Sequence, residues 1–202
     1  MTQFNAHGAD VYVEESLPAI AADAAELFVR LARQSYTRGK PFRVALSGGS
    51  TPRLLYGLLA SDTFRDGVNW DNIIFFFGDE RWVAHNHRES NYGMAKASLL
   101  DHVDVPEAQV HRFAGEMIPG EAAYVADQAL RAFAEAVGEG PIFDVMMLGA
   151  GPDGHTASLF PEHNALQVRD RLVIRTEAPA QFEVRDRLTM TLPALESSRL
   201  VL

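Results

Sequence analysis

The chain contains 202 residues, and its content of 47% hydrophobic and 22% charged residues predicts a single globular domain over residues 1–202. A formal net charge of −9 argues against general nucleic-acid binding, which needs a basic surface, but leaves room for one small anion in a locally positive pocket. With no cysteine, no secretory pattern in residues 1–10 and no apolar run of membrane-spanning length, the chain is expected to be cytoplasmic, with no membrane partner and no thiolate metal site.

Short apolar runs alternate along the chain with longer helical patterns. Strands are predicted at residues 10–14, 42–46, 73–77, 110–113, 143–148, 172–175 and 188–191. The run at residues 73–77 lacks polar alternation, which is typical of a strand buried on both faces.

The segments between these strands have helical spacing. Ser16 is expected to cap the first helix, with Pro18 in its first turn. The apolar face of this helix would consist of Ile20, Ala24, Leu27, Phe28 and Leu31. Further helices are predicted at residues 52–60, 91–100 and 121–137. The alternation of strands and helices predicts an α/β fold, with a mostly parallel sheet covered by helices on both sides.

Three of the predicted buried strands run directly into loops rich in glycine, hydroxyl or charged residues. These loops begin at Ser47, Gly78 and Gly149. In parallel α/β sheets, ligands bind outside the carboxyl ends of the strands. We therefore expect the three loops to form one crevice with convergent polar groups.

The first loop, with the sequence SGGSTP, has the composition of an anion-binding turn. Gly48 and Gly49 would let backbone N–H groups approach a ligand, and Ser50 and Thr51 add hydroxyl donors. A phosphate would then lie at the N-terminus of the following helix. The alternative is an ordinary strand-to-helix turn in which the hydroxyl groups only cap the helix. No Gly-Lys-Ser/Thr follows, so the loop is not a nucleoside-triphosphate-binding P-loop.

Residues 149–154 have the spacing G-x-G-x-x-G, which also occurs in dinucleotide-binding folds. Pro161 leaves room for only about one and a half helical turns after Gly154, so we do not interpret the spacing as a dinucleotide site. The glycines are instead expected to open space around His155. A histidine at a strand end can accept a proton from water during attack on an acyl carbon, whereas the alternative is a capping or core histidine.

The second loop contains Asp79 and Arg81. In one interpretation, Arg81 stabilises negative charge on a carbonyl oxygen or clamps a substrate, and Asp79 orients it. In the other interpretation, the two residues form a structural ion pair. His85 and His87 have a spacing that could ligate a metal, but the sequence shows no third ligand nearby, so a metal site is not predicted.

Four segments together resemble a known family. They are LSGGSTP, GDERWV followed by Ser90 and Asn91, FDVMMLGAGPDGHTASLFP, and the late RLT. In this order they closely resemble the 6-phosphogluconolactonase family, and the resemblance extends over residues 44–191. The related glucosamine-6-phosphate deaminases share the GSTP loop. They typically follow the Gly-His pair with Ile-Ala-Phe-Asn-Glu, where this chain has Thr-Ala-Ser-Leu-Phe.

The resemblance implies a reaction, a fold and a set of site residues. The reaction is hydrolysis of 6-phospho-D-glucono-1,5-lactone to 6-phosphogluconate in the oxidative pentose phosphate pathway, by a three-layer αβα Rossmann-like fold without a cofactor. His155 would be the general base. Arg81, with Asp79 nearby, would bind the sugar and offset charge on the tetrahedral intermediate. The implied substrate-binding residues are Gly48, Gly49, Ser50, Thr51, Asn91, Gly151 and Arg187.

Two alternatives to the lactonase remain open. One is a deaminase or isomerase acting on an amino-sugar phosphate, and the other is a non-catalytic sugar-phosphate sensor. A sensor needs an anion site but no base, so the presence of His155 beside Asp79 and Arg81 weighs against it. In each case the partner is a small sugar phosphate, and the protein is expected to be a monomer or a weak homodimer.

One departure from the family concerns the end of the sequence. Family members usually continue through a strand, a glycine-containing turn with a lysine, and a closing helix. This sequence stops within the strand predicted at residues 199–202. We therefore expect the fold to lack its C-terminal end.

Overall fold

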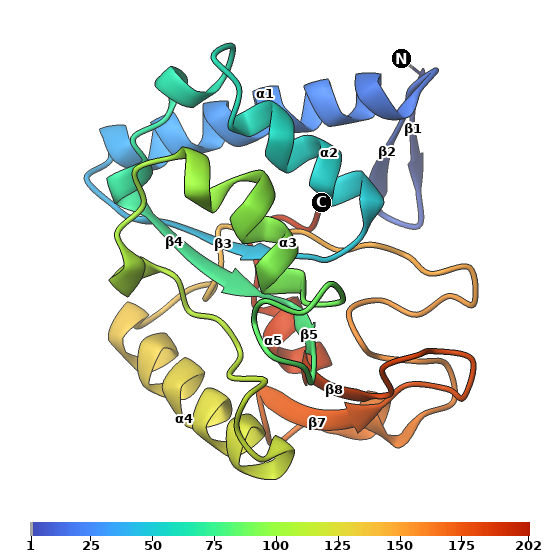
Figure 1. Cartoon of the computed structure of the whole chain (residues 1–202). Coiled ribbons are helices and arrows are strands. Elements are labelled where there is room, and N and C mark those ends of the chain that lie inside the picture. Colours follow the sequence, from blue (N-terminus) through green and yellow to red (C-terminus); the bar gives the residue numbers. More distant parts are fainter. Residues whose placement is uncertain (1) are drawn as a thin grey trace.

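The computed structural model describes residues 2–202, so residue 1 of the predicted domain lies outside it. A parallel sheet with the strand order β4–β3–β6 lies between two groups of helices (Figure 1). Its strands are β3 (Phe42–Leu46), β4 (Ile73–Phe77) and β6 (Val145–Met146). Residues 198–202 run alongside β6 and form parallel bridges from Ser198 to Phe143 and from Val201 to Met146. The parallel sheet predicted from the apolar runs is confirmed.

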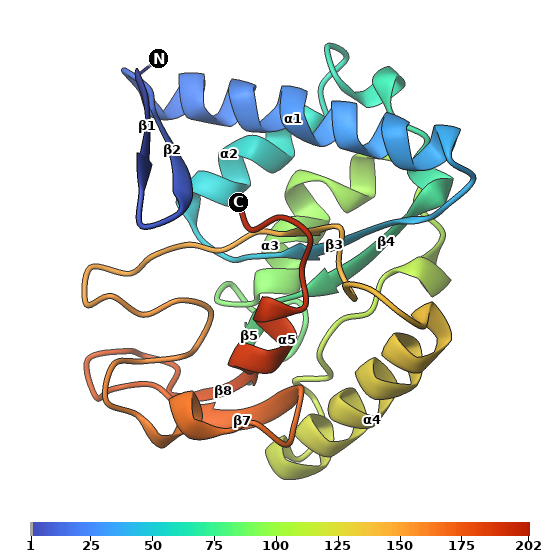
Figure 2. The same ribbon diagram turned by 180° about the vertical axis from the view of Figure 1, so that it is seen from behind.

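Helices cover both faces of this sheet (Figures 1 and 2). Phe42 pairs with Ile73 in the β3–β4 register, and Phe76 therefore points to the opposite face. Phe42 contacts Phe28 of α1 (Leu17–Thr37) with ring centroids 5.3 Å apart, whereas Phe76 contacts Phe133 of α4 (Pro119–Val137) at 4.9 Å. The first face is covered by α1, α2 (Ser50–Leu59) and α3 (Asn91–Ser98), and the second by α4. The three-layer αβα prediction is confirmed.

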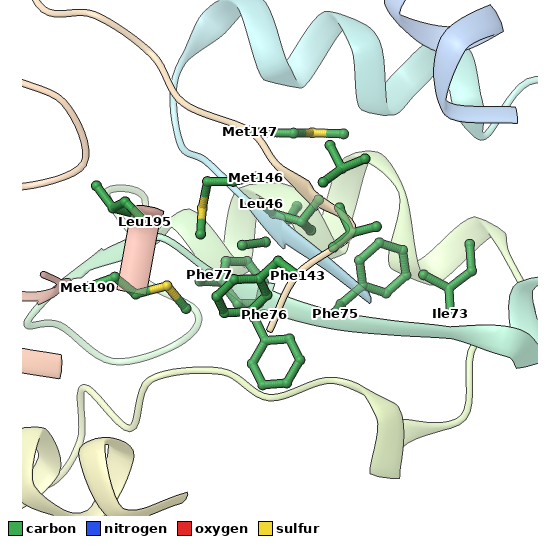
Figure 3. Packing of buried hydrophobic residues seen from close by; sticks show 14 of the residues in the cluster. Leu46, Ile73, Phe75, Phe76, Phe77, Phe143, Met146, Met147, Met190 and Leu195 are labelled. Atoms are coloured by element: carbon green, nitrogen blue, oxygen red, sulfur yellow. The ribbon is translucent and has the colours of Figure 1, made fainter. Parts of the chain in front are cut away.

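The phenylalanines of β4 form the centre of the hydrophobic core. Phe75 and Phe77 are 0% and 1% exposed, and they belong to the buried cluster drawn in Figure 3. Burying one such side chain contributes about 1.5–3 kcal/mol to folding. Because residues 73–77 are apolar on both faces, β4 is fixed between the helical layers, and the loop that follows it has a defined position.

The later strands form a second, antiparallel sheet with the order β5–β8–β7. Its strands are β5 (Asp79–Arg81), β7 (Val173–Glu177) and β8 (Asp186–Met190), and the short helix α5 (Leu192–Glu196) follows β8. Strands near residues 172–175 and 188–191 are confirmed, but their antiparallel pairing differs from the mostly parallel arrangement expected for them. The loop at residues 178–185 is too short for a crossover helix, so β7 and β8 pair as a hairpin.

The first predicted strand belongs to an exposed antiparallel hairpin of β1 (Thr2–Ala6) and β2 (Ala9–Val13), and not to the parallel sheet. Ser16 caps α1 as predicted, since its Oγ accepts a hydrogen bond from Ala19 N at 3.3 Å. The buried stripe of α1 is shifted from the predicted face, because small alanines allow the closest packing. It consists of Ala21, Ala25, Phe28 and Ala32.

Other predicted elements are shorter in the structure. The strand predicted at residues 110–113 is reduced to one bridge between Val110 and Phe75. The strand predicted at residues 143–148 is reduced to β6, and the helix predicted at residues 91–100 ends at Ser98. Short 3₁₀ turns lie at Arg65–Gly67, Trp70–Asn72, Leu100–His102, Glu107–Gln109 and Asn164–Gln167. Within residues 2–202, no helix combines the length and the hydrophobicity needed to cross a membrane.

Candidate active site

The loops that follow β3, β4 and β6 surround one cavity of about 550 Å³. Every site residue predicted from the sequence lines this cavity except Arg187. The predicted residues in the lining are Gly48, Gly49, Ser50, Thr51, Asp79, Arg81, Asn91, Gly151 and His155. The three loops therefore meet beyond the carboxyl ends of the parallel strands, where folds of this class bind ligands.

The ring of His155 is hydrogen-bonded to Asp153. Its Nδ1 lies 2.5 Å from Asp153 Oδ1, and this hydrogen bond holds the pKa of the Asp153 carboxyl below its usual range. A carboxylate can only accept hydrogen bonds, so the pairing places the proton of the neutral ring on Nδ1 and leaves a lone pair on Nε2. His155 Nε2 can then accept a proton, which is the property of a general base.

Gly151 provides the space that the His155 ring occupies. A Cβ atom at residue 151 would lie 2.2 Å from both Cε1 and Nδ1 of the imidazole. The backbone N–H of Gly151 also donates to His155 O at 2.8 Å. The prediction that glycine opens space around His155 is confirmed at this residue.

Asp79 is a buried carboxylate whose two oxygens both have partners. Ser158 Oγ donates to Oδ2 at 2.6 Å, and Asn91 Nδ2 donates to Oδ1 at 3.1 Å. Arg81 instead donates from Nη1 to Glu89 O at 2.8 Å and lies 3.6 Å from Glu89 Oε2. Arg81 thus pairs with Glu89 and not with Asp79. The contacts of Asp79 orient Asn91 and Ser158.

Glu80 organises the N-terminus of α3 and is 2% exposed. Its Oε1 accepts from the backbone N–H groups of Arg81 and Asn91 at 2.8 and 2.7 Å. Its Oε2 accepts from Tyr92 N at 2.8 Å and from Ser90 Oγ at 3.0 Å. Burial raises the pKa of Glu80, and the backbone N–H donors oppose this rise. Because α3 begins at Asn91, Glu80 fixes the point at which Asn91 meets the cavity.

The loop between β3 and α2 presents a helix N-terminus to the cavity. No side chain caps α2 at Gly49, whose φ of +114° suits glycine, so the first-turn N–H groups can bind an anion. A Cβ atom on Gly48 would lie 1.9 Å from Asn91 Oδ1. The loop is anchored by Tyr56, whose hydroxyl accepts from Ser47 N at 3.0 Å and donates to Ser47 O at 2.8 Å. Burial raises the pKa of Tyr56, so this hydroxyl keeps its proton.

Two polar atoms of the cavity lining have no hydrogen-bond partner among the described residues. They are Ser47 Oγ and Arg81 Nε, and both are buried. Buried polar atoms are normally hydrogen-bonded, to protein or to ordered water. These two atoms are therefore candidates for contact with a polar ligand in the cavity.

Arg187 lies beside the cavity, opposite Arg81 in the β5–β8 register. Its Nε donates to Val184 O at 2.9 Å, and its Cζ lies 5.6 Å from the centroid of the Phe182 ring. Burial and, after it, the nearby charge of Arg81 lower the pKa of Arg187. The charges of Asp79, Glu89 and Glu80 lie close enough to oppose this lowering, so acidic and basic groups are mixed at this edge of the sheet.

The two histidines considered as metal ligands have other contacts. His85 packs against the ring of Tyr92, with centroids 6.2 Å apart. His87 Nδ1 accepts from Glu89 N at 3.2 Å. Across residues 2–202, no three His, Cys, Asp or Glu side chains are grouped in a way that could hold a metal ion.

Comparison with known proteins places the chain in a family. The profile of the family described as "Glucosamine-6-phosphate isomerases/6-phosphogluconolactonase" matches residues 15–202. The chain belongs to this family. A 6-phosphogluconolactonase from Synechocystis is 42% identical over 160 residues, which cover 78% of this chain and 63% of the relative. One from Nostoc is 41% identical over 163 residues, covering 80% and 65%. The chain thus matches less than two thirds of the length of either relative.

Solved structures of 6-phosphogluconolactonases have the same fold. The structure from Thermotoga maritima has a TM-score of 0.79 at 27% identity, covering 94% of this chain and 80% of that one. The structure from Trypanosoma brucei has a TM-score of 0.79 at 28% identity, covering 94% and 79%. The fold shared with the lactonases of this family therefore includes nearly all of the chain.

Several residues with contacts at the site are absent from the sequence-based prediction. Among them are Ser47, Glu80, Asp153 and Ser158. Asp153 has a usable signal, because a carboxylate two residues before a histidine can reach its ring. Ser47 could be found from its place at the start of the SGGSTP loop. Glu80 and Ser158 act through contacts between segments, such as Ser158 with Asp79, and residue spacing does not reveal these.

Proposed function

We propose that the cavity hydrolyses 6-phospho-D-glucono-1,5-lactone to 6-phospho-D-gluconate, a reaction of the oxidative pentose phosphate pathway. The observation that carries this proposal is the pairing of His155 with Asp153 in a cavity that also contains Arg81 and the N-terminus of α2. A base, a cation and an anion-binding loop are thereby combined in one place. The names of the similar curated proteins support the same substrate.

In the proposed reaction, a water oxygen attacks C1 of the lactone while His155 Nε2 takes one of its protons. Arg81 offsets the negative charge on the carbonyl oxygen of the tetrahedral intermediate. The intermediate then collapses, the bond between C1 and the ring oxygen breaks, and the imidazolium returns the proton to that oxygen. A lactone is an activated ester, so the reaction requires neither a covalent nucleophile nor a cofactor.

The other predicted residues would bind the sugar or its phosphate. The loop at residues 48–51 offers backbone N–H groups and two hydroxyls at the start of α2, which suits a phosphate. Asn91, held by Asp79, faces the same cavity, as does Gly151. Arg187 would add positive charge from its place beside Arg81.

We also propose that residues 1–202 act as a single domain in the cytoplasm, as a monomer or weak homodimer that binds a sugar phosphate and no nucleic acid. The absence of cysteine and the net charge of −9 support this view. Gel filtration with light scattering would measure the oligomeric state, and a tetramer would contradict the proposal.

Proton release from freshly generated lactone tests the proposed function. The chain should hydrolyse the lactone faster than the spontaneous reaction, and His155→Ala should lower the enzymatic rate by about 10²-fold or more. His102→Ala, which removes an exposed histidine, is the matched control and should have no effect. Equal rates for the wild type and His155→Ala would show that His155 is not the base.

The same protein preparations distinguish the lactonase from the two alternatives, a deaminase and a sensor. Release of ammonia from glucosamine 6-phosphate, without lactone hydrolysis, would identify a deaminase. Binding of 6-phosphogluconate without either reaction would identify a sensor.

A further inference from the structure

Phe182 belongs to the loop at residues 178–185, which joins β7 to β8. Its ring contacts two side chains of the proposed site. The ring centroids of Phe182 and His155 are 5.7 Å apart with an interplanar angle of 85°, and Cζ of Arg187 lies 5.6 Å from the Phe182 centroid. Phe182 is not part of the cavity lining, and its contacts with His155 and Arg187 connect it to the site.

We propose that Phe182 is a positioning residue. Its aromatic ring holds both the His155 imidazole and the Arg187 guanidinium in place. The inference rests on the proposed function, because it concerns the arrangement of the proposed base and of a proposed substrate-binding arginine. The shared ring couples the two side chains, so a change at Phe182 affects both proton transfer and substrate binding.

The His155 ring needs support besides its hydrogen bond to Asp153. One hydrogen bond through Nδ1 leaves the ring able to tilt about that bond. Phe160 is 3% exposed and contacts the imidazole at a centroid distance of 4.7 Å. Phe182 contacts both His155 and Phe160, the latter at 5.4 Å. The two phenylalanines together fix the plane of the imidazole and hence the direction of Nε2.

Arg187 depends on Phe182 for a different reason. Its guanidinium is buried beside the like charge of Arg81, and both the burial and this charge oppose its charged state. The negative face of an aromatic ring attracts a guanidinium and so offsets part of this cost. Without the ring, we expect Arg187 to turn away from Arg81 toward solvent.

An ion pair between two exposed side chains bridges the loop that carries Phe182 and the loop that carries Arg88. Arg88 Nη2 lies 2.5 Å from Oε2 of Glu183, the residue that follows Phe182. Arg88 also precedes Glu89, which holds Arg81. The Phe182 loop therefore lies beside the segment that positions the other arginine of the site.

A set of substitutions at Phe182 tests this role. Phe182→Ala should lower kcat/KM for the lactone by about tenfold to 10²-fold, through both kcat and KM, because displacements near 1 Å have effects of this size. Phe182→Tyr keeps the ring and should stay within about twofold of the wild type. Phe182→Leu keeps apolar bulk but no aromatic face, so it should raise KM more than it lowers kcat. Tyr124→Ala, which removes an aromatic side chain 64% exposed on α4, is the matched control.

Two kinetic outcomes would overturn the inference. One is wild-type kinetics in Phe182→Ala, and the other is a Phe182→Tyr variant as impaired as Phe182→Ala. Because Phe182 is only partly buried, the variants should keep the wild-type Tm, and circular dichroism checks this.

Nitrogen NMR gives a readout that does not depend on activity. The ring signals of His155 and the Nε–H signal of Arg187 should both shift in Phe182→Ala and stay near their wild-type positions in Phe182→Tyr and Tyr124→Ala. If the wild type hydrolyses no lactone, the proposed function fails, and the NMR comparison still decides the positioning role. Unchanged signals in Phe182→Ala would then exclude it.

Discussion

Asp79 lines the cavity, and Glu80 and Asp153 are hydrogen-bonded to residues that line it. The hydrogen bonds of these three carboxylates give each a different role. Asp79 accepts from Ser158 and Asn91, Glu80 accepts from the start of α3, and Asp153 pairs with the imidazole of His155. Of the three, only Asp153 contacts a group that takes part in the proposed proton transfer, the imidazole of His155. The other two carboxylates are buried and act on the positions of neighbouring groups.

Asp153→Asn should lower kcat/KM for lactone hydrolysis by about 10²-fold, within the range known for general acid–base groups. The asparagine amide can donate to Nδ1, which moves the proton of the neutral ring to Nε2 and removes the base. Initial rates of proton release measure the effect. Asp104→Asn alters an exposed aspartate away from the cavity and should behave as the wild type. A wild-type rate in Asp153→Asn would show that the pairing does not set the tautomer.

Arg81→Ala should lower kcat/KM by about 10²-fold or more if Arg81 stabilises the oxyanion. Arg81→Lys keeps a positive charge but loses Nε and the planar fork, so it should recover only part of the rate. Arg38→Ala, at the exposed end of α1, is the control. Equal kcat/KM values for Arg81→Ala and the control, measured over a range of lactone concentrations, would rule out this role.

At the scale of elements, the sequence predicts best where burial alone determines the structure. The predicted bounds of β3 and β4 match the structure, because both are short apolar runs enclosed between helical layers. The pairing of β7 with β8 depends on loop length and on neighbouring elements, which apolar patterns do not contain. The same limit applies to the site. Glycine-rich loops at strand ends reveal its location, whereas contacts between loops, such as that of Phe182 with His155, do not follow from spacing.

Glu80 connects two elements, and Glu80→Gln tests that connection. An amide NH₂ would face donors that now point at a carboxylate oxygen, so we expect the free energy of unfolding to fall by about 2 kcal/mol. Urea titration followed by fluorescence measures this change. Glu121→Gln, in the exposed first turn of α4, should change stability by only a few tenths of a kcal/mol. Equal stabilities of the two variants would mean that Glu80 does not hold α3.

At the scale of the whole molecule, the cavity is assembled from loops that follow different strands of one sheet. The loops after β3, β4 and β6 have no covalent link near the site, and the packing of the sheet against its helices holds them in register. Phe76 is central to this packing. Its ring contacts Phe133 of α4 at 4.9 Å and Phe143 before β6 at 5.3 Å, so it joins three segments that are distant in the sequence.

Phe76→Ala should lower the free energy of unfolding by about 3–5 kcal/mol, as expected for truncation of a buried phenylalanine. In a chain of this length, that corresponds to a fall in Tm of roughly 10 °C. Phe4→Ala, in the exposed hairpin, removes the same ring at 50% exposure and should have little effect. If the layers unfold together, calorimetry of Phe76→Ala will show one transition at the lower temperature. Two transitions would mean that α4 separates from the sheet first, and that the core does not hold the cavity loops as one unit.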